Sequence, residues 1–190
     1  MTRAGTWLDR LDLRLHNQVL DLRQTWLDDV FRTITHLGGV QANAILLGAA
    51  IVFGFRTRRI VFPTFAYVAL TVGQLARTAL SYSIDRARPP RGDWLVFAPG
   101  RAMPSGHSAT SVMAYGLLVM LVWSLLTTSV QRRAAVIGVA VIAVLVGASR
   151  VYLGVHWPSD VIAGWAFGAA WVGLCVVGWR ALGPRLSHPT

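Results

Sequence analysis

Residues Gly147–Asp160 read GASRVYLGVHWPSD and join two long apolar runs of the chain. Three ionisable side chains lie in this junction, namely Arg150, His156 and Asp160. Ionisable groups at the boundary of a membrane segment are costly, so the stretch predicts a functional site. His156 and Asp160 are four residues apart, which sets the carboxylate beside the imidazole if a helix begins near Pro158. An arginine, a histidine and a carboxylate that orients the histidine together indicate phosphate chemistry.

The composition of the chain is that of a membrane protein. Of its 190 residues, 54% are apolar and only 14% are charged, against about 45–50% and 25% in soluble domains. The length fits a single domain over residues 1–190. The one cysteine excludes a disulfide framework and a thiol metal site.

The basic residues indicate a membrane partner. A net charge of +10 would favour nucleic-acid binding in a soluble protein. Here the arginines stand at the ends of apolar runs, where they set topology and contact anionic headgroups. We therefore expect membrane lipids, and no nucleic acid, as partners. The oligomeric state has no signature in the sequence.

Five apolar runs predict an all-α bundle of about five transmembrane helices. Crossing the hydrocarbon core takes roughly 20 residues of helix. We expect a transmembrane core over residues 37–182, with loops at 56–59, 83–104 and 131–133. The apolar runs cover residues 40–55 with a lead-in from 37, 60–82, 106–128, 134–153 and 158–179.

Residues 1–36 contain no spanning run. Leucines, valines and tryptophans alternate there with arginine and aspartate, which predicts an amphipathic helix in the membrane interface. We expect this segment to be a membrane-surface anchor without a direct role at the substrate.

Counting the crossings places the polar clusters on one membrane face, together with the N-terminal segment. The opposite face carries many arginines and no acid, namely Arg56, Arg58, Arg59, Arg132, Arg133, Arg180 and Arg185. By the positive-inside rule that second face is cytoplasmic. We therefore expect a multi-pass protein of the cell membrane with its site on the extracytoplasmic face.

A second polar cluster opens the third apolar run. Ser105 is a natural N-cap, and the free amides that follow it, including that of Gly106, form an anion site at a helix start. His107 in the same turn is placed to give a proton to a departing oxygen. A third cluster, which includes Arg77, Ser81, Arg86 and Arg88, supplies guanidinium groups suited to phosphate oxygens.

Three short motifs within residues 81–160 resemble the signatures of the type 2 phosphatidic acid phosphatase (PAP2) superfamily, which includes bacterial integral-membrane lipid phosphatases. Ser149-Arg150, five residues, His156, three residues and Asp160 look like the third signature. Pro104-Ser105-Gly106-His107 matches the second signature, and Arg88-Pro89 fits the end of the first.

The resemblance implies a helical bundle that removes phosphate from lipid phosphates or diphosphates without a metal or another cofactor. It implies that His156 is the nucleophile and becomes a phosphohistidine, with Asp160 as its partner. His107 would protonate the leaving group. The phosphate ligands implied by the resemblance are Arg88, Arg150, Ser105 and Gly106.

One position departs from the family pattern. The first signature begins with a lysine, and Ser81 stands there instead. Arg77 lies one helical turn earlier on the same face and is our candidate for the missing cation. Arg86 is the competing candidate.

The expected function is a lipid phosphatase acting on a polyprenyl diphosphate or on phosphatidylglycerol phosphate. Two alternatives stay open at this point. A phosphotransferase would pass the phosphate to a lipid or sugar acceptor, and a non-hydrolytic protein would bind or transport the lipid.

Overall fold

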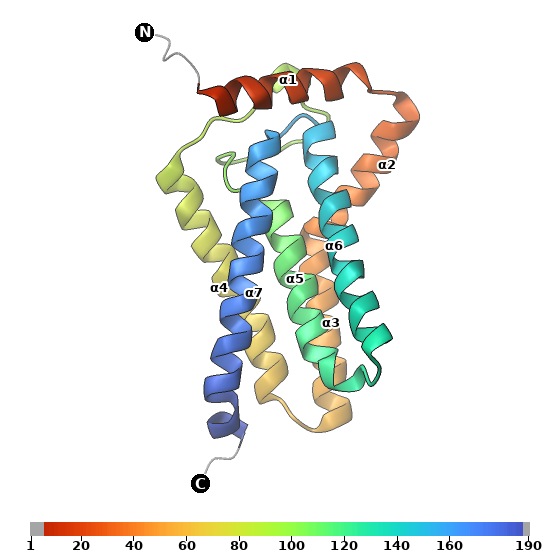
Figure 1. The fold of residues 1–190 in the computed structure, drawn as a ribbon, viewed down its shortest axis with the longest axis vertical. Helices are drawn as coiled ribbons and strands as arrows, with labels where there is room; N and C mark the ends of the chain where they lie inside the picture. The colour runs from red at the N-terminus through yellow and green to blue at the C-terminus, as the bar shows by residue number, and fades with distance from the viewer. Residues whose placement is uncertain (1–5, 188–190) are drawn as a thin grey trace.

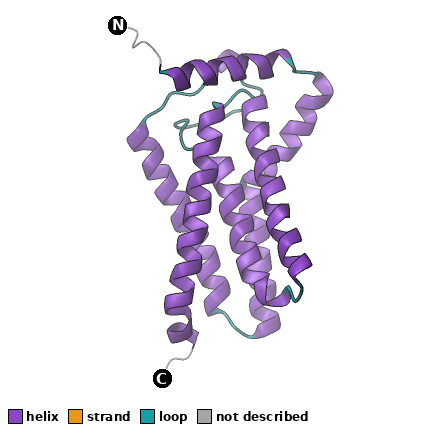
Figure 2. Ribbon diagram, in the orientation of Figure 1, coloured by secondary structure: helices purple, strands orange, loops and turns teal. Residues whose placement is uncertain are grey.

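Five long helices run side by side, and a shorter helix lies across one end of them (Figure 1). The computed structural model describes residues 6–187, and this part of the chain contains only helices and loops (Figure 2). The helices in chain order are α1 (Trp7–Asp21), α2 (Thr25–Thr35), the 3₁₀ turn η1 (His36–Gly38), α3 (Val40–Thr57), α4 (Val61–Ile84), the 3₁₀ turn η2 (Arg91–Asp93), α5 (Gly106–Val122), the 3₁₀ turn η3 (Trp123–Leu125), α6 (Ser129–Tyr152) and α7 (Pro158–Ser187).

Helix α5 is the centre of the bundle and packs against α3, α4, α6 and α7. Its side chains Met113, Leu117 and Leu121 are fully buried. Helix α7 approaches α5 closely through Gly164 and Gly168. A Cβ at Gly164 would lie 2.7 Å from the carbonyl oxygen of Ser105. Small residues thus let the two backbones meet, as is common between membrane helices.

The predicted membrane bundle is confirmed, with a difference in the number of spans. Among the described residues, four helices are long and apolar enough to cross a membrane, namely Val40–Thr57, Gly106–Leu125, Ser129–Tyr152 and Pro158–Gly183. Large apolar side chains such as Ile51, Phe55 and Ile137 are exposed on their outer faces. An apolar outer surface is what a lipid environment requires.

The fifth long helix, α4, is not among those four candidate spans. It has 24 residues but contains Gln74 and Arg77 in its second half. The Gln74 side chain donates hydrogen bonds to Asn43 on α3, at 3.0 Å, and to Thr110 on α5, at 3.3 Å. These polar groups are satisfied inside the bundle, where α4 packs as the fifth helix.

The prediction of a loop at residues 131–133 is wrong. These residues form the first turn of α6, because Thr128 and Gln131 make a capping box. The Gln131 N–H donates to Thr128 Oγ1 at 3.1 Å, and the Thr128 N–H donates to Gln131 Oε1 at 3.1 Å. A capping box starts a helix by satisfying its free amides, and here it outweighs the polarity of the turn.

Helix α1 lies across the end of the bundle where α3, α5 and α7 begin and α4 and α6 end (Figure 1). A capping box between Thr6 and Asp9 starts it. The same end carries the loop 85–105, the first turn of α5 and the turn 153–157. The fold therefore brings the three polar clusters together, as the order of the crossings predicts.

Candidate active site

His156 and Asp160 lie side by side in the interior of that end. The His156 side chain is 2% exposed and Asp160 is fully buried, and His156 Nδ1 is 3.4 Å from Asp160 Oδ2. The turn before them depends on Gly154, whose φ of +74° favours glycine and whose Cβ position is filled by the Asp93 carbonyl. Asp160 Oδ2 also accepts the Trp157 N–H at 2.9 Å, which fixes the carboxylate at the start of α7.

Arg88 holds the other side of the His156 ring. Its Nη1 donates to His156 Nε2 at 2.8 Å and to the Val155 carbonyl at 2.8 Å. Its Nε and Nη2 donate to the carbonyl oxygens of Gly100 and Pro99. Since an arginine only donates, His156 Nε2 accepts and the ring proton sits on Nδ1, toward Asp160.

Arg150 approaches the site from the last turn of α6. It is 3% exposed, and its Nη1 donates to Thr35 Oγ1 of α2 at 2.8 Å. Its Nε has no hydrogen-bond partner among the described residues. A buried guanidinium with free donor capacity is suited to bind an anion.

His107 stands in the first turn of α5, against the turn η1. A Cβ at Gly39 would lie 3.4 Å from His107 Nε2, and one at Gly38 would lie 2.8 Å from the His107 carbonyl. The pair of glycines therefore makes room for this histidine. The charges of Arg150, Arg88 and His156 all act on it, so His107 belongs to the same cluster.

Ser105 occupies the N-cap position of α5, but its side chain makes no capping hydrogen bond. Its hydroxyl accepts instead from Ser108 Oγ at 3.0 Å. Its N–H donates to the Asp160 carbonyl at 2.9 Å and so ties the start of α5 to the start of α7. The next residue, Gly106, faces Arg77, whose Cζ would be 3.4 Å from a Cβ there.

The cluster carries an excess of positive charge. Arg77, Arg88 and Arg150 all act on His156, and no carboxylate pairs with any of the three within the described part of the chain. Burial, followed by the charges of Arg88 and Arg150, holds the pKa of His156 well below its usual value. The ring is therefore neutral near pH 7, and its Nε2 lone pair is available.

Residues 62–183 match the PAP2 superfamily. The chain belongs to this superfamily. Phosphatidylglycerophosphatase B of Bacillus subtilis (strain 168) is 36% identical to it over 151 residues, which cover 77% of this chain and 72% of that protein. An undecaprenyl-diphosphatase of Sulfolobus acidocaldarius is 40% identical over 81 residues, which cover 43% of this chain and 34% of that protein. The chain is thus an enzyme, a membrane phosphatase of the PAP2 type.

Two solved structures share the fold. The crystal structure of a transmembrane PAP2-type phosphatidylglycerolphosphate phosphatase from Bacillus subtilis matches with a TM-score of 0.87 and 28% identity, over 94% of this chain and 89% of that chain. The LpxE structure from Aquifex aeolicus matches with a TM-score of 0.67 and 23% identity, over 87% of this chain and 94% of that chain. The second likeness concerns the fold alone.

Two residues at or near the position of the PAP2 lysine, Ser81 and Arg86, already bind other groups of the protein through their side chains. The Ser81 hydroxyl is buried and donates to the Thr78 carbonyl of its own helix at 2.7 Å. Arg86 forms ion pairs with Asp12 at 2.7 Å and with Asp160 at 2.8 Å. Within residues 6–187, the side-chain partner of the Arg77 guanidinium is Thr78 Oγ1 alone, at 2.8 Å, so Arg77 is the better candidate for the missing cation.

Sequence reasoning missed the contribution of α1 to this end of the PAP2 bundle. Asp12 and His16 are 2% and 1% exposed, although their segment reads as a surface anchor. His16 Nε2 lies 3.0 Å from Asp93 Oδ2, and its ring packs on Trp157. The available signal was their spacing of four residues, which puts two ionisable groups on one helix face.

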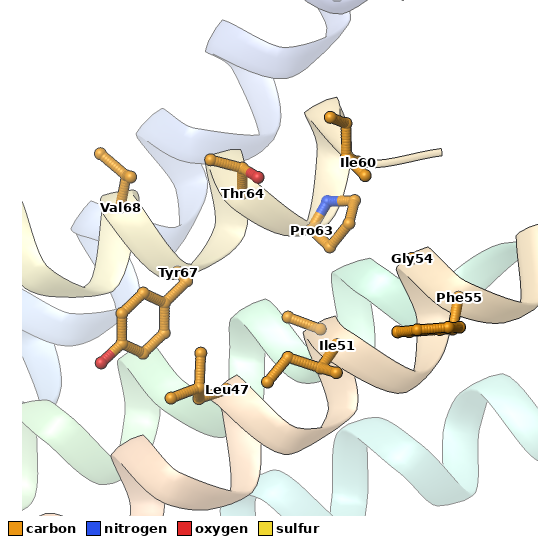
Figure 3. A pocket seen from close by; sticks show the side chains of 10 residues that line it. Leu47, Ile51, Gly54, Phe55, Ile60, Pro63, Thr64, Tyr67 and Val68 are labelled. Atoms are coloured by element: carbon orange, nitrogen blue, oxygen red, sulfur yellow. The ribbon is translucent and has the colours of Figure 1, made fainter. Parts of the chain in front are cut away.

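Two apolar cavities lie away from His156. One of about 320 Å³ is between α3 and α4, in the half of the bundle remote from α1, with Ile51, Pro63 and Tyr67 in its wall (Figure 3). A larger one, of about 730 Å³, lies between α5, α6 and α7 with Phe62 of α4 also in its wall, and extends from Val112 on α5 to Trp123 just after it.

Proposed function

We propose that this enzyme removes the terminal phosphate from a lipid phosphate, with His156 as the nucleophile and a phosphohistidine as the intermediate. Phosphatidylglycerol phosphate is the favoured substrate, since the relative that is similar over 72% of its own length is named a phosphatidylglycerophosphatase. A polyprenyl diphosphate is the second candidate, supported by the shorter similarity to an undecaprenyl-diphosphatase.

The observation that carries the proposal is the group of three arginines around a buried, neutral histidine. Arg77, Arg88 and Arg150 have no carboxylate partner among residues 6–187, and their charges converge on His156. Buried charges of one sign are unfavourable unless an ion of the other sign completes the site. A phosphate group with two negative charges has the size and the acceptors to do so.

The first chemical step forms the bond between His156 Nε2 and phosphorus. In the structure, Arg88 Nη1 donates a hydrogen bond to His156 Nε2. When the substrate binds, a phosphate oxygen accepts this hydrogen bond instead, and the Nε2 lone pair becomes free to attack. The bond between phosphorus and the lipid oxygen breaks, and His107, whose protonated form is stabilised by the negative charge of the bound phosphate, transfers its proton to that oxygen. Asp160 stabilises the positive charge on the phosphorylated ring through Nδ1.

The second step releases the phosphate. His107, now neutral, accepts a proton from water as the water oxygen attacks phosphorus. The bond between Nε2 and phosphorus breaks, inorganic phosphate leaves, and both histidines return to their starting states. Arg88, Arg150, Arg77 and the Gly106 amide bind the phosphate oxygens in both steps. Ser105 holds this amide in place through its own N–H bond to the Asp160 carbonyl.

An apolar tail is compatible with the cavity between α5, α6 and α7. From Val112 to Trp123 along α5 it extends roughly 16 Å at 1.5 Å per residue, and its wall is built mostly of valine, alanine and methionine. Its upper end begins one and a half turns below His107. A lipid with its head at His107 and one tail along α5 fits this arrangement.

We infer that the site faces the outside of the cell membrane. The opposite end of the bundle carries arginines and no acid in and around its turns, namely Arg56, Arg58, Arg59, Arg132 and Arg133, which is typical of a cytoplasmic face. The test uses a Cys175→Ala background with a single cysteine at Arg101 or at Arg133. A membrane-impermeant thiol reagent on intact cells should label the first and not the second, and the reverse result places the site inside.

The decisive experiment is a substrate panel with the purified full-length protein. Phosphatidylglycerol phosphate, undecaprenyl diphosphate and phosphatidic acid are compared by release of inorganic phosphate, with and without EDTA. We expect EDTA-insensitive release that is lost in His156→Ala. Activity in His156→Ala would overturn the role of this residue. Phosphate transfer that requires an added acceptor would instead identify a phosphotransferase.

A further inference from the structure

The two most buried residues of helix α1 are polar, whereas several of its large apolar residues are exposed. Its buried residues are Asp12 and His16, whereas Trp7 is 69% exposed, Leu11 41% and Leu13 50%. An anchor that only lies in the membrane interface has no reason to bury a carboxylate, because burial is unfavourable unless the charge is paired and hydrogen-bonded.

Asp12 is fully paired at the start of α7. Its Oδ1 accepts the Ser159 N–H at 2.9 Å. Its Oδ2 accepts the Ser159 hydroxyl and, at 2.7 Å, the Nη2 of Arg86. Ser159 is the neighbour of Asp160, so α1 is attached directly to the segment that holds the carboxylate of the site.

Arg86 connects the two buried carboxylates. While its Nη2 binds Asp12, its Nη1 donates to Asp160 Oδ1 at 2.8 Å. The other oxygen of Asp160 lies 3.4 Å from His156 Nδ1. A chain of ion pairs therefore runs from Asp12 on α1 through Arg86 to Asp160, whose carboxylate lies beside the imidazole without a hydrogen bond to its Nδ1.

We propose that Asp12 is a positioning residue of this active site, which acts through Arg86 on Asp160 and thereby on His156. This inference rests on the proposed role of His156 as nucleophile. Asp12 balances the charge of Arg86 and fixes its direction. Without Asp12, the whole charge of Arg86 falls on Asp160, which draws the carboxylate away from the imidazole and weakens its support of the phosphorylated ring.

The charge balance around His156 gives this proposal a specific readout. Arg86 also forms an ion pair with the exposed Asp9 at 3.4 Å. The charge of Asp9 offsets only part of the negative charge that is lost with Asp12. Asp12→Asn removes one negative charge from behind Asp160, which disfavours the imidazolium form and lowers the pKa of His156 further. The charged and titratable groups that face His156 are Arg77 on α4, Arg88 in the loop, His107 on α5, Arg150 on α6 and Asp160 on α7.

The experiment compares wild-type protein, Asp12→Asn and His16→Gln, each full-length and in the same detergent. His16 is the matched control, since it is buried on the same helix face and binds Asp93 but does not contact Arg86 or Asp160. For Asp12→Asn we expect kcat to fall about 10- to 100-fold with KM unchanged, and the acidic limb of the kcat/KM profile to move to lower pH. His16→Gln should lower thermal stability and leave that limb in place.

Two results would overturn the inference. One is an Asp12→Asn profile with the wild-type acidic limb and kcat. The other is an equal shift of the acidic limb in His16→Gln, which would show that Asp12 and His16 both act only by docking α1 on the bundle. If Asp12→Asn does not fold, the charge balance is tested in Asp12→Asn combined with Arg86→Gln, which removes both charges together. No charge of Arg86 then acts on Asp160, so the acidic limb should lie at or above its wild-type pH, and a limb at lower pH would contradict the inference.

A readout without turnover separates this inference from the proposed function. The pKa of His156 is followed by NMR of ¹⁵N-labelled histidine, with the resonance assigned by its loss in His156→Gln. A wild-type protein that releases no phosphate from any lipid overturns the proposed function. An unchanged His156 pKa in Asp12→Asn overturns the role of Asp12, whatever the substrate.

Discussion

Arg88 Nη1 lies 2.8 Å from His156 Nε2 and donates a hydrogen bond to it. This contact sets the tautomer of the imidazole and keeps the attacking nitrogen on the side of the arginines. The same guanidinium donates to three backbone carbonyls, those of Val155, Pro99 and Gly100. Arg88 therefore shapes the loop around the site as well as the ring itself.

Arg88→Lys should lower kcat/KM by about 100-fold, because a lysine ammonium cannot reproduce a planar fork that binds several acceptors at once. The measurement is steady-state phosphate release. Arg101→Lys is the control, since Arg101 lies in the same loop and its side chain is 46% exposed. Near-wild-type activity of Arg88→Lys would contradict the assigned role.

The stability of the protein should fall in acid because of His156. Burial, together with Arg88 and Arg150, lowers the pKa of His156 in the folded state, whereas the unfolded chain binds a proton with a pKa of about 6.5. The neutral His156 therefore contributes fully to the free energy of unfolding above about pH 6.5. Below that pH this contribution is lost, by up to about 1.4 kcal/mol per pH unit. Thermal unfolding in detergent at several pH values measures it. His156→Gln should show a shallower loss, and equal slopes in both proteins would refute the assignment.

His107→Asn should slow the reaction in a way that depends on the leaving group. With a lipid phosphate the loss should be about 10²- to 10⁴-fold, because the alkoxide must be protonated as it leaves. With p-nitrophenyl phosphate the loss should be much smaller, since the phenolate leaves without a proton. Rates for both substrates test this, and losses of equal size would show that His107 is not the acid.

Arg77→Ala should lower kcat/KM about 10- to 100-fold, the range for a charged hydrogen bond to substrate, and Arg77→Lys should restore part of it. Ser81→Ala should have little effect, because the Ser81 hydroxyl already bonds to its own helix. Steady-state kinetics of the three variants decide the question. If Ser81→Ala is the more damaging change, the serine and not the arginine serves the substrate.

Gly147→Ala should reduce thermal stability. A Cβ at Gly147 would collide with Trp165 and Val161 of α7, and such overpacking costs about 1–3 kcal/mol. Gly138→Ala on the same helix meets nothing within 4 Å and should be neutral or slightly stabilising. The Tm of each variant is compared in one detergent, and an equal Tm for the two would contradict the close contact between α6 and α7.

Most of the helical bundle was predictable from the apolar runs. The run that begins at Gly106 and the one that begins at Pro158 start helices at those residues, because serine at an N-cap position and proline at a first turn are local signals. The Ser105 side chain itself makes no capping hydrogen bond. The start of α6 was not found. Gln131 belongs to a capping box, and a polar turn at the end of an apolar run resembles a loop when only hydropathy is considered.

The residues of the candidate site also divide into those that local sequence patterns predict and those that they do not. His156 lies in the turn before α7 and Asp160 in the first turn of that helix. The two were found by their spacing, and His107 was found by its place at a helix start. Asp12 was not found, because its partner Ser159 is far away in the chain and a single aspartate in an amphipathic segment is the ordinary pattern of a solvated face. Contacts between distant segments depend on tertiary packing, which local periodicity does not encode.

The bond between Asp12 and Ser159 joins residues 147 positions apart, one on α1 and the other in the first turn of α7. During biosynthesis α1 leaves the ribosome well before α7, so Asp12 meets Ser159 only after α7 has been synthesised. Until then Arg86 is available to Asp12, whereas Asp160, its other carboxylate partner, does not yet exist. The two carboxylates that share Arg86 therefore come together only when α7 joins the bundle.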